Sequence, residues 1–155
     1  MTLHIVERPA LTVMGLHLKT QPMSPDIPAL WPRFMDRVSE IEHPLEPEVS
    51  YGVMRHSADM RALDYWAAVS VSRADRTPSG METVTLPAGH YACFRFPLSG
   101  LAAGFGEIFE RRLPQSNYEQ VDGPYFERYD EAFDPTRPDS LVEVCLPVRR
   151  KGMAG

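Results

Sequence analysis

The chain of 155 residues lacks several features that define large classes of proteins. It has 16 Lys and Arg against 21 Asp and Glu, a formal net charge of −5. It therefore lacks the basic surface that binds nucleic acid or an anionic membrane directly. Its two cysteines are too few for a disulfide scaffold, and neither belongs to a C-x-x-C pair that would hold zinc. We expect a reduced, cytoplasmic protein.

Long apolar runs and targeting signals are also missing. No stretch approaches the roughly eighteen uninterrupted apolar residues of a transmembrane helix. The N-terminal segment Met1-Thr2-Leu3-His4 has no basic start followed by an apolar run, so it is not a signal peptide. We expect a protein that is neither exported nor embedded in a membrane.

Motifs for cofactor and metal chemistry are absent as well. Gly104 and Gly106 match the first two glycines of a dinucleotide fingerprint, but Phe109 occupies the third position, so we interpret them as helix-packing or flexibility positions. The chain has no phosphate-binding P-loop and no G-x-S-x-G elbow. Its five histidines show no metal-binding spacing. We expect neither a cofactor nor a metal ion.

Fifteen prolines divide the chain into short periodic segments. Apolar or alternating runs predict strands, and apolar residues at steps of three and four predict helices. The expected strands cover residues 3–7, 11–18, 51–55, 64–72, 81–86, 91–98, 125–129 and 141–148. The expected helices cover residues 27–41 and 101–113.

The order of these elements repeats after a linker candidate at residues 76–80. Each half contains two strands, a helix and two strands, and we expect the first two strands of each half to form a hairpin. The sequence therefore predicts an α+β fold of two fused β-β-α-β-β units related by a pseudo-two-fold axis. Its antiparallel sheets carry the helices on one side, with a ligand groove between the units. We expect one domain over residues 1–155, with repeats at about 1–75 and 80–150.

One strand pair near the C-terminus carries a distinctive pattern. Alternation places Tyr125, Glu127 and Tyr129 on one face of the strand 125–129, with Phe126 and Arg128 on the other. A carboxylate flanked by aromatic rings suits an organic cation, which gains from both the rings and the negative charge.

The last strand alternates too. Valine and leucine form one face of residues 141–148, while Glu143 and Cys145 point the other way. The register between the two strands, left open by the pattern, decides whether Glu143 shares a face with Glu127. Cys145, like Cys93, lies in an apolar strand and is interpreted as a small buried side chain.

A simpler interpretation competes with the ligand site. Glu127 can be a solvated sheet residue neutralised by Arg95 or Arg128. The larger aromatic side chains can likewise be ordinary core residues; these are Tyr51, Trp66, Trp31 and Phe105.

Four segments together resemble a known family. They are residues 86–92 (LPAGHYA), 113–119 (LPQSNYE), 123–129 (GPYFERY) and 142–148 (VEVCLPV). In order and spacing they resemble the GyrI-like small-molecule-binding family, which also occurs as the C-terminal effector-binding domain of AraC-type and MerR-type multidrug regulators. The resemblance covers the second half of the chain, and the first half is similar mainly through its layout of elements.

The resemblance implies roles for particular residues. Glu127, in the Gly-Pro-x-x-Glu motif, would be the acidic anchor for cationic ligands at the base of an aromatic pocket. Glu143 would be a second carboxylate. The pocket walls would be Tyr129, Tyr51 and Trp66, with Phe105 from the second helix. Cys145 stands where the family often carries an aromatic residue, which would change the shape of the pocket wall.

The resemblance leaves three functional hypotheses. With its first strand expected at Leu3, the chain has no room for the N-terminal helix-turn-helix of such regulators. The first hypothesis is a stand-alone binding protein for cationic or polyaromatic small organic molecules, acting as a sink or sensor. The second is a hydrolase of cyclopropanoid or other reactive natural products, in which Glu127 activates water. The third is a protein-interaction module that partners a regulator or a topoisomerase.

Overall fold

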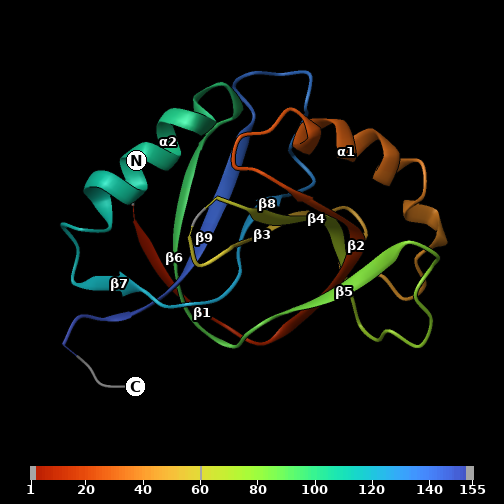
Figure 1. The fold of residues 1–155 in the computed structure, drawn as a ribbon, viewed down its shortest axis with the longest axis horizontal. Coiled ribbons are helices and arrows are strands. Elements are labelled where there is room, and N and C mark those ends of the chain that lie inside the picture. Colours follow the sequence, from red (N-terminus) through yellow and green to blue (C-terminus); the bar gives the residue numbers. More distant parts are fainter. Residues whose placement is uncertain (1–2, 60, 153–155) are drawn as a thin grey trace.

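The structure, a computed structural model, describes residues 3–59 and 61–152 and consists of a large sheet with two helices (Figure 1). The helices are α1 (Asp26–Met35) and α2 (Leu101–Glu107), and both lie on the same side of the sheet (Figure 1). All recorded strand pairs are antiparallel. The predicted α+β class is therefore confirmed. Within the described ranges, no helix is both long and apolar enough to cross a membrane.

The sheet has nine strands arranged symmetrically in space. They are β1 (His4–Arg8), β2 (Leu11–Thr20), β3 (Ser50–His56), β4 (Leu63–Val71), β5 (Met81–Leu86), β6 (Gly89–Pro97), β7 (Tyr118–Gln120), β8 (Tyr125–Tyr129) and β9 (Leu141–Arg150). Their order is β1-β6-β9-β8-β3-β4-β2-β5, with the short β7 on β9. The order reads the same from both ends when β8 is matched with β3, β9 with β4, β6 with β2 and β1 with β5. The two halves of the chain therefore meet at the β3–β8 pair, while the repeat boundaries near residues 75 and 80 stay a prediction.

The two predicted hairpins are wrong. β1 pairs with β6 rather than β2, and β5 pairs with β2 rather than β6. A two-residue hairpin needs a positive φ at its first central residue, and Pro9 and Pro87 occupy that position with φ locked near −65°. Each two-residue connection spans at most about 10 Å yet joins strands far apart in the sheet order. The sheet therefore curls until its β1 and β5 edges approach each other.

Both helices are shorter than predicted. α1 ends at Met35 and is followed by a 3-10 turn, η1 (Val38–Glu40). The prediction extended the helix to Ile41 because this residue continues the apolar spacing. Ile41 is buried, but it lies outside the helix. α2 ends at Glu107 and continues as a wider π-helical turn, η3 (Ile108–Arg112).

Gly104 sets how closely α2 packs on the sheet. A Cβ at Gly104 would lie 2.7 Å from the ring of Phe96 on β6, which is closer than any real contact. The interpretation of this glycine as a helix-packing position is confirmed. The close approach holds α2 on β6, in the half of the sheet that also contains β8 and β9. The other helix, α1, packs on β2 and β4 in the other half, on the same side of the sheet.

The buried side chains form two clusters, one on each face of the sheet. The face under the helices contains Phe34, Tyr65, Phe94, Ile108 and Leu146, among others. The opposite face contains Tyr51, Trp66, Tyr91, Phe126 and both cysteines, which are buried as expected. The predicted alternation along β8 and β9 is confirmed, since neighbouring residues in each strand belong to different clusters.

Candidate functional site

A cavity of about 700 Å³ lies under the two helices, over β3, β4 and β8. This volume is within the range of small-molecule sites. The lining is mostly apolar and aromatic, and includes Met54, Tyr65, Leu101, Phe105, Phe109, Tyr125, Glu127 and Tyr129. We call it the Glu127 cavity, because Glu127 is the single acidic residue in its lining.

Glu127 reaches the cavity through the alternation of β8, which turns Tyr125, Glu127 and Tyr129 toward the helices. Its partner in β3 is Gly52. A Cβ at Gly52 would lie 2.6 Å from Glu127 Oε1 and would also collide with the hydroxyl of Tyr65. The absence of a side chain at Gly52 therefore makes the space in which the carboxylate and the tyrosine hydroxyl meet.

Two tyrosine hydroxyls hold the Glu127 carboxylate, and Trp31 contacts both tyrosines. The Tyr129 hydroxyl donates to Oε1 at 2.8 Å, and the Tyr65 hydroxyl donates to the same oxygen at 3.2 Å. Trp31 Nε1 donates to the Tyr65 hydroxyl at 3.0 Å, and the Trp31 ring meets the Tyr129 ring edge-on, with centroids 5.5 Å apart. The carboxylate is thus oriented by hydroxyl groups that are themselves fixed by packing.

Burial dominates the ionisation of this group. Glu127 is only 5% exposed, and desolvation raises its pKa to about 7 although the hydrogen bonds from Tyr129 and Tyr65 work in the other direction. Burial and the neighbouring carboxylate also raise the pKa values of Tyr65 and Tyr129 well above the usual range. The two hydroxyls therefore stay protonated and act as donors at neutral pH.

The competing interpretation, in which an arginine neutralises a solvated Glu127, is wrong. Arg128 points to the opposite face and pairs with Glu46 at 3.2 Å. Arg95 pairs with Glu143 at 3.3 Å. Among the described residues, Glu127 makes no ion pair. Because no internal cation compensates for burial, the charged form of Glu127 is disfavoured, in agreement with its raised pKa.

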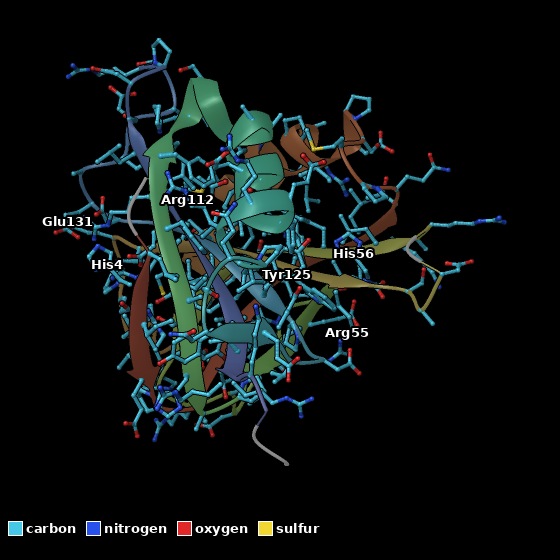
Figure 2. The ribbon with its side chains drawn as sticks, turned by 90° about the vertical axis from the view of Figure 1, so that its left-hand side faces the viewer. His4, Arg55, His56, Arg112, Tyr125 and Glu131 are labelled. Carbon is cyan, nitrogen blue, oxygen red and sulfur yellow. The ribbon has the colours of Figure 1, made fainter. Side chains whose placement is uncertain are left out.

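The far end of the cavity carries a second polar pair. The Tyr125 hydroxyl hydrogen-bonds His56 Nε2, and the two rings stack with centroids 5.5 Å apart (Figure 2). Burial lowers the pKa of His56, so its ring is neutral at pH 7. His56 Nδ1 is buried and has no hydrogen-bond partner within the described part of the chain. This end can therefore hydrogen-bond a ligand without adding charge.

An aromatic wall connects the two ends. The Phe105 and Phe109 rings stack with centroids 6.3 Å apart, and both meet the Tyr125 ring edge-on at 6.5 and 6.2 Å. The π-helical turn η3 carries Phe109 into this stack. The structure thus brings three predicted site residues together in one cavity: Glu127, Tyr129 and Phe105.

The other three predicted site residues lie elsewhere. The Tyr51 hydroxyl donates to Glu46 at 2.6 Å, and the Trp66 ring stacks on His17 at 4.7 Å, both on the face away from the helices. Glu143 is opposite Arg128 in the β8–β9 register, so it too faces away from Glu127. The structure does not bring them together with Glu127, and a role for them in ligand binding stays a prediction.

Sequence reasoning missed Tyr65, Gly52 and His56. Tyr65 and Trp66 are neighbours in one strand, and the pattern there did not show which of them faces the helices. The role of Gly52 depends on its pairing with Glu127, which the sequence did not show. A glycine inside an apolar strand was the available signal, since such a glycine often marks a close approach of another group.

The site offers hydrogen bonding, one titratable carboxylate and apolar surface. Within residues 3–59 and 61–152, no three His, Cys, Asp or Glu side chains converge in a way that could hold a metal ion. The side chains of the cavity offer charge and proton transfer at Glu127, hydroxyl donors beside it and aromatic faces around it.

Comparison with known proteins agrees with this geometry. The sequence profile of the GyrI-like small molecule binding domain matches residues 1–149. The transcriptional regulator BrlR of Pseudomonas aeruginosa is 33% identical over 147 residues, which cover 93% of this chain and 54% of that protein. The chain thus spans about half the length of this curated relative.

Two solved structures have a similar fold. SAV2435 bound to tetraphenylphosphonium matches with a TM-score of 0.77 and 16% identity, over 96% of this chain and 94% of that one. The C-terminal domain of EcmrR matches with a TM-score of 0.72 and 13% identity, over 96% and 98% of the two chains. With the profile match over nearly the whole sequence, these findings show that the chain belongs to the GyrI-like small-molecule-binding domain family.

Proposed function

We propose that this protein is a cytoplasmic binding protein that sequesters or senses lipophilic organic cations in the Glu127 cavity. The observation that carries the proposal is a 5% exposed carboxylate, without an ion-pair partner in the described residues, set in an aromatic cavity of about 700 Å³. An organic cation would supply the missing charge, and the ring faces around it would favour its apolar body. The tetraphenylphosphonium in the SAV2435 structure is a ligand of this kind.

The cavity suits many ligands rather than one. Its directional polar groups are concentrated at Glu127 and at the His56–Tyr125 pair, and most of the remaining lining is apolar. Apolar contact depends on area more than on shape, so cations of different outline can be held with the charge near Glu127. We therefore infer recognition of a chemical class, defined by positive charge and aromatic or alkyl bulk.

The direct test is the substitution Glu127→Gln with tetraphenylphosphonium as the probe. Calorimetric titration at pH 8 should show about 10- to 100-fold weaker binding, because the amide keeps the shape but loses the charge. Triphenylphosphine oxide, which is neutral, should bind the two proteins with similar affinity. Glu46→Gln, on the other face, is the matched control. Unchanged tetraphenylphosphonium affinity in Glu127→Gln would overturn the proposal.

A hydrolase is the second candidate, favoured by the pKa of Glu127 at about 7. A general base or acid is most effective when its pKa lies near the operating pH. In such a reaction Glu127 would take a proton from water while the water oxygen bonds to a carbon of a strained ring. The ring bond would break, its electron pair would pass into a conjugated carbonyl group, and Glu127 would return the proton to the product.

Catalysis and binding are separated by counting turnovers. The protein would be incubated with an excess of a cyclopropane-bearing alkylating agent, and mass spectrometry would follow a product heavier by one water. A hydrolase forms more than one equivalent of this product, and Glu127→Gln abolishes it. One equivalent or less leaves binding as the function of the cavity.

A further inference from the structure

A second hollow, of about 450 Å³, lies beside the Glu127 cavity. Its lining includes Trp31, Met35, Glu48, Tyr129, Glu131 and Phe133, and we call it the Trp31 hollow. Tyr129 lines both spaces, and Trp31 donates to Tyr65, which lines the Glu127 cavity. The Trp31 and Tyr129 side chains therefore form a wall between two separate spaces.

The walls of the Trp31 hollow are aromatic. Tyr129 is flanked edge-on by Trp31, with centroids 5.5 Å apart, and by Phe133, with centroids 4.7 Å apart. Met35, at the end of α1, is 54% exposed at its rim. Trp31, Tyr129 and Phe133 are half-buried, and apolar side chains that line a hollow in this way are characteristic of binding sites. Three ring systems and a flexible thioether present faces that a cation or an apolar body can contact.

The charge of the hollow has one sign. Its lining contains the carboxyl groups of Glu48, Asp130 and Glu131, and no lysine, arginine or histidine. Within the described ranges, none of these three carboxylates takes part in an ion pair. Figure 2 shows Glu131 at the outer margin of the molecule, away from His56 and Tyr125. The negative potential is therefore directed toward solvent and is free to attract a positive ligand.

A neighbouring groove shows the contrast. It is lined by Arg95 and by residues of the segment 128–143, including Arg137, Asp139 and Glu143, and it shares Asp130 with the Trp31 hollow. Arg95 pairs with Glu143 at 3.3 Å, and Arg137 with Asp139 at 3.4 Å. Its charges are largely satisfied within the protein, and it has no aromatic lining. Unlike this groove, the Trp31 hollow combines aromatic faces with the carboxylates of Glu48 and Glu131, which are unpaired within the described residues.

We propose that the Trp31 hollow is a second binding site, specific for small quaternary ammonium cations that carry an aromatic or alkyl group. The ammonium group lies among the carboxylates at the rim, and the apolar group lies against Trp31 and Phe133. The site is separate from the Glu127 cavity and does not need the Glu127 charge. It differs in that Glu48 and Glu131 are exposed whereas Glu127 is buried, so its carboxylates act through charge at the surface rather than through burial.

The methionines distinguish the two sites directly. Met35 lines the Trp31 hollow, whereas Met23 and Met54 line the Glu127 cavity. With ¹³C-methyl methionine labelling and benzyltrimethylammonium as the probe, the Met35 resonance of Glu127→Gln should shift in a saturable manner. Met35→Leu assigns that resonance. A titration that moves only Met23 and Met54, or none of the three, would overturn the second site.

A charge variant tests the chemistry of recognition. The double substitution Glu48→Gln and Glu131→Gln, made on Glu127→Gln, affects two exposed side chains. It should weaken benzyltrimethylammonium binding roughly tenfold, as followed at Met35, because two attractive charges are lost. Glu7→Gln with Glu110→Gln removes the same charge from exposed positions outside the hollow and serves as the control. Equal weakening by both pairs, or no weakening by the first, would contradict a specific cation site.

Discussion

Two glutamates that contact opposite faces of the sheet, Glu127 in β8 and Glu46 in the loop before β3, have opposite ionisation behaviour. Burial raises the pKa of Glu46, but hydrogen bonds from Tyr51, Ser70 and Arg128 outweigh that effect and hold it below the usual range. Glu127 also has two hydroxyl donors, yet its pKa rises to about 7 because it is more deeply buried and has no arginine. The Glu46 carboxylate thus has Arg128 as an ion-pair partner within the protein, whereas the Glu127 carboxylate faces a cavity.

The largest expected effect is on stability. In Glu127 the pKa rises from 4.5 in the unfolded chain to about 7 in the folded one. The folded state therefore binds its proton more tightly, and stability falls as pH rises from 4.5 to 7. Glu127→Gln should raise the free energy of unfolding by up to about 3 kcal/mol at pH 8 and leave it unchanged at pH 4.

Urea denaturation at the two pH values measures this change, with Glu46→Gln as the comparison. The lowered pKa of Glu46 has the opposite sign, so its charge stabilises the fold above pH 4.5 and that stability is lost as pH falls through the lowered value. Glu46→Gln should therefore destabilise the protein at pH 8. If Glu127→Gln and Glu46→Gln changed the free energy of unfolding at pH 8 in the same direction, the proposed difference between the two carboxylates would be wrong.

Ligand affinity should follow the ionisation of Glu127 almost as strongly. A cation binds the ionised form, which is about one in a hundred molecules at pH 5 if the pKa is about 7. Tetraphenylphosphonium affinity should therefore rise roughly 100-fold between pH 5 and pH 8 and then level off. Calorimetry across this range gives the profile, and the Glu127→Gln protein should show a flat one. A flat profile for the unaltered protein would mean that the carboxylate does not hold the ligand.

Gly52→Ala tests the space that Glu127 occupies. The added methyl group would displace the Glu127 carboxylate and the Tyr65 hydroxyl, and overpacking of this kind costs about 2 kcal/mol. Tetraphenylphosphonium binding should weaken along with stability. Gly106→Ala is the control, because a Cβ there meets nothing within 4 Å and alanine is the better helix former. Thermal denaturation of both variants provides the comparison.

The smallest effect is expected on the face without the cavity. Arg128→Leu leaves Glu46 with its hydroxyl partners only, and because the pair is partly exposed we expect a loss of about 1 kcal/mol at pH 7. The loss should shrink as the pH falls through the lowered pKa of Glu46, where the carboxyl group takes up a proton. Tetraphenylphosphonium affinity at pH 8 should not change, since Arg128 lies on the other face. A large change in affinity would show that the two faces are coupled.

Some of these features were predictable from short-range pattern. Alternation along residues 125–129 placed Tyr125, Glu127 and Tyr129 on one face before any strand partner was known, and the structure confirms that face as the cavity wall. The pattern did not resolve β4, two strands away from β8 in the sheet order, where Tyr65 rather than its neighbour Trp66 hydrogen-bonds the carboxylate. Side-chain direction reverses at every residue of a strand, so an uncertainty of one position exchanges the two faces of the sheet.

The sequence by itself determined the low basic content, the two isolated cysteines and the missing motifs. It also located both helices and all strands except the short β7, because these depend on residue type and on near neighbours, but it placed the helix ends too far along the chain. Tertiary structure decided that β1 pairs with β6 and β5 with β2, each in the other half of the chain. It also decided that Gly52 leaves space for Glu127 and that Arg128 pairs with Glu46 rather than with Glu127. Each of these depends on which distant strands become partners. That choice is made by the packing of the whole chain, which local periodicity does not record.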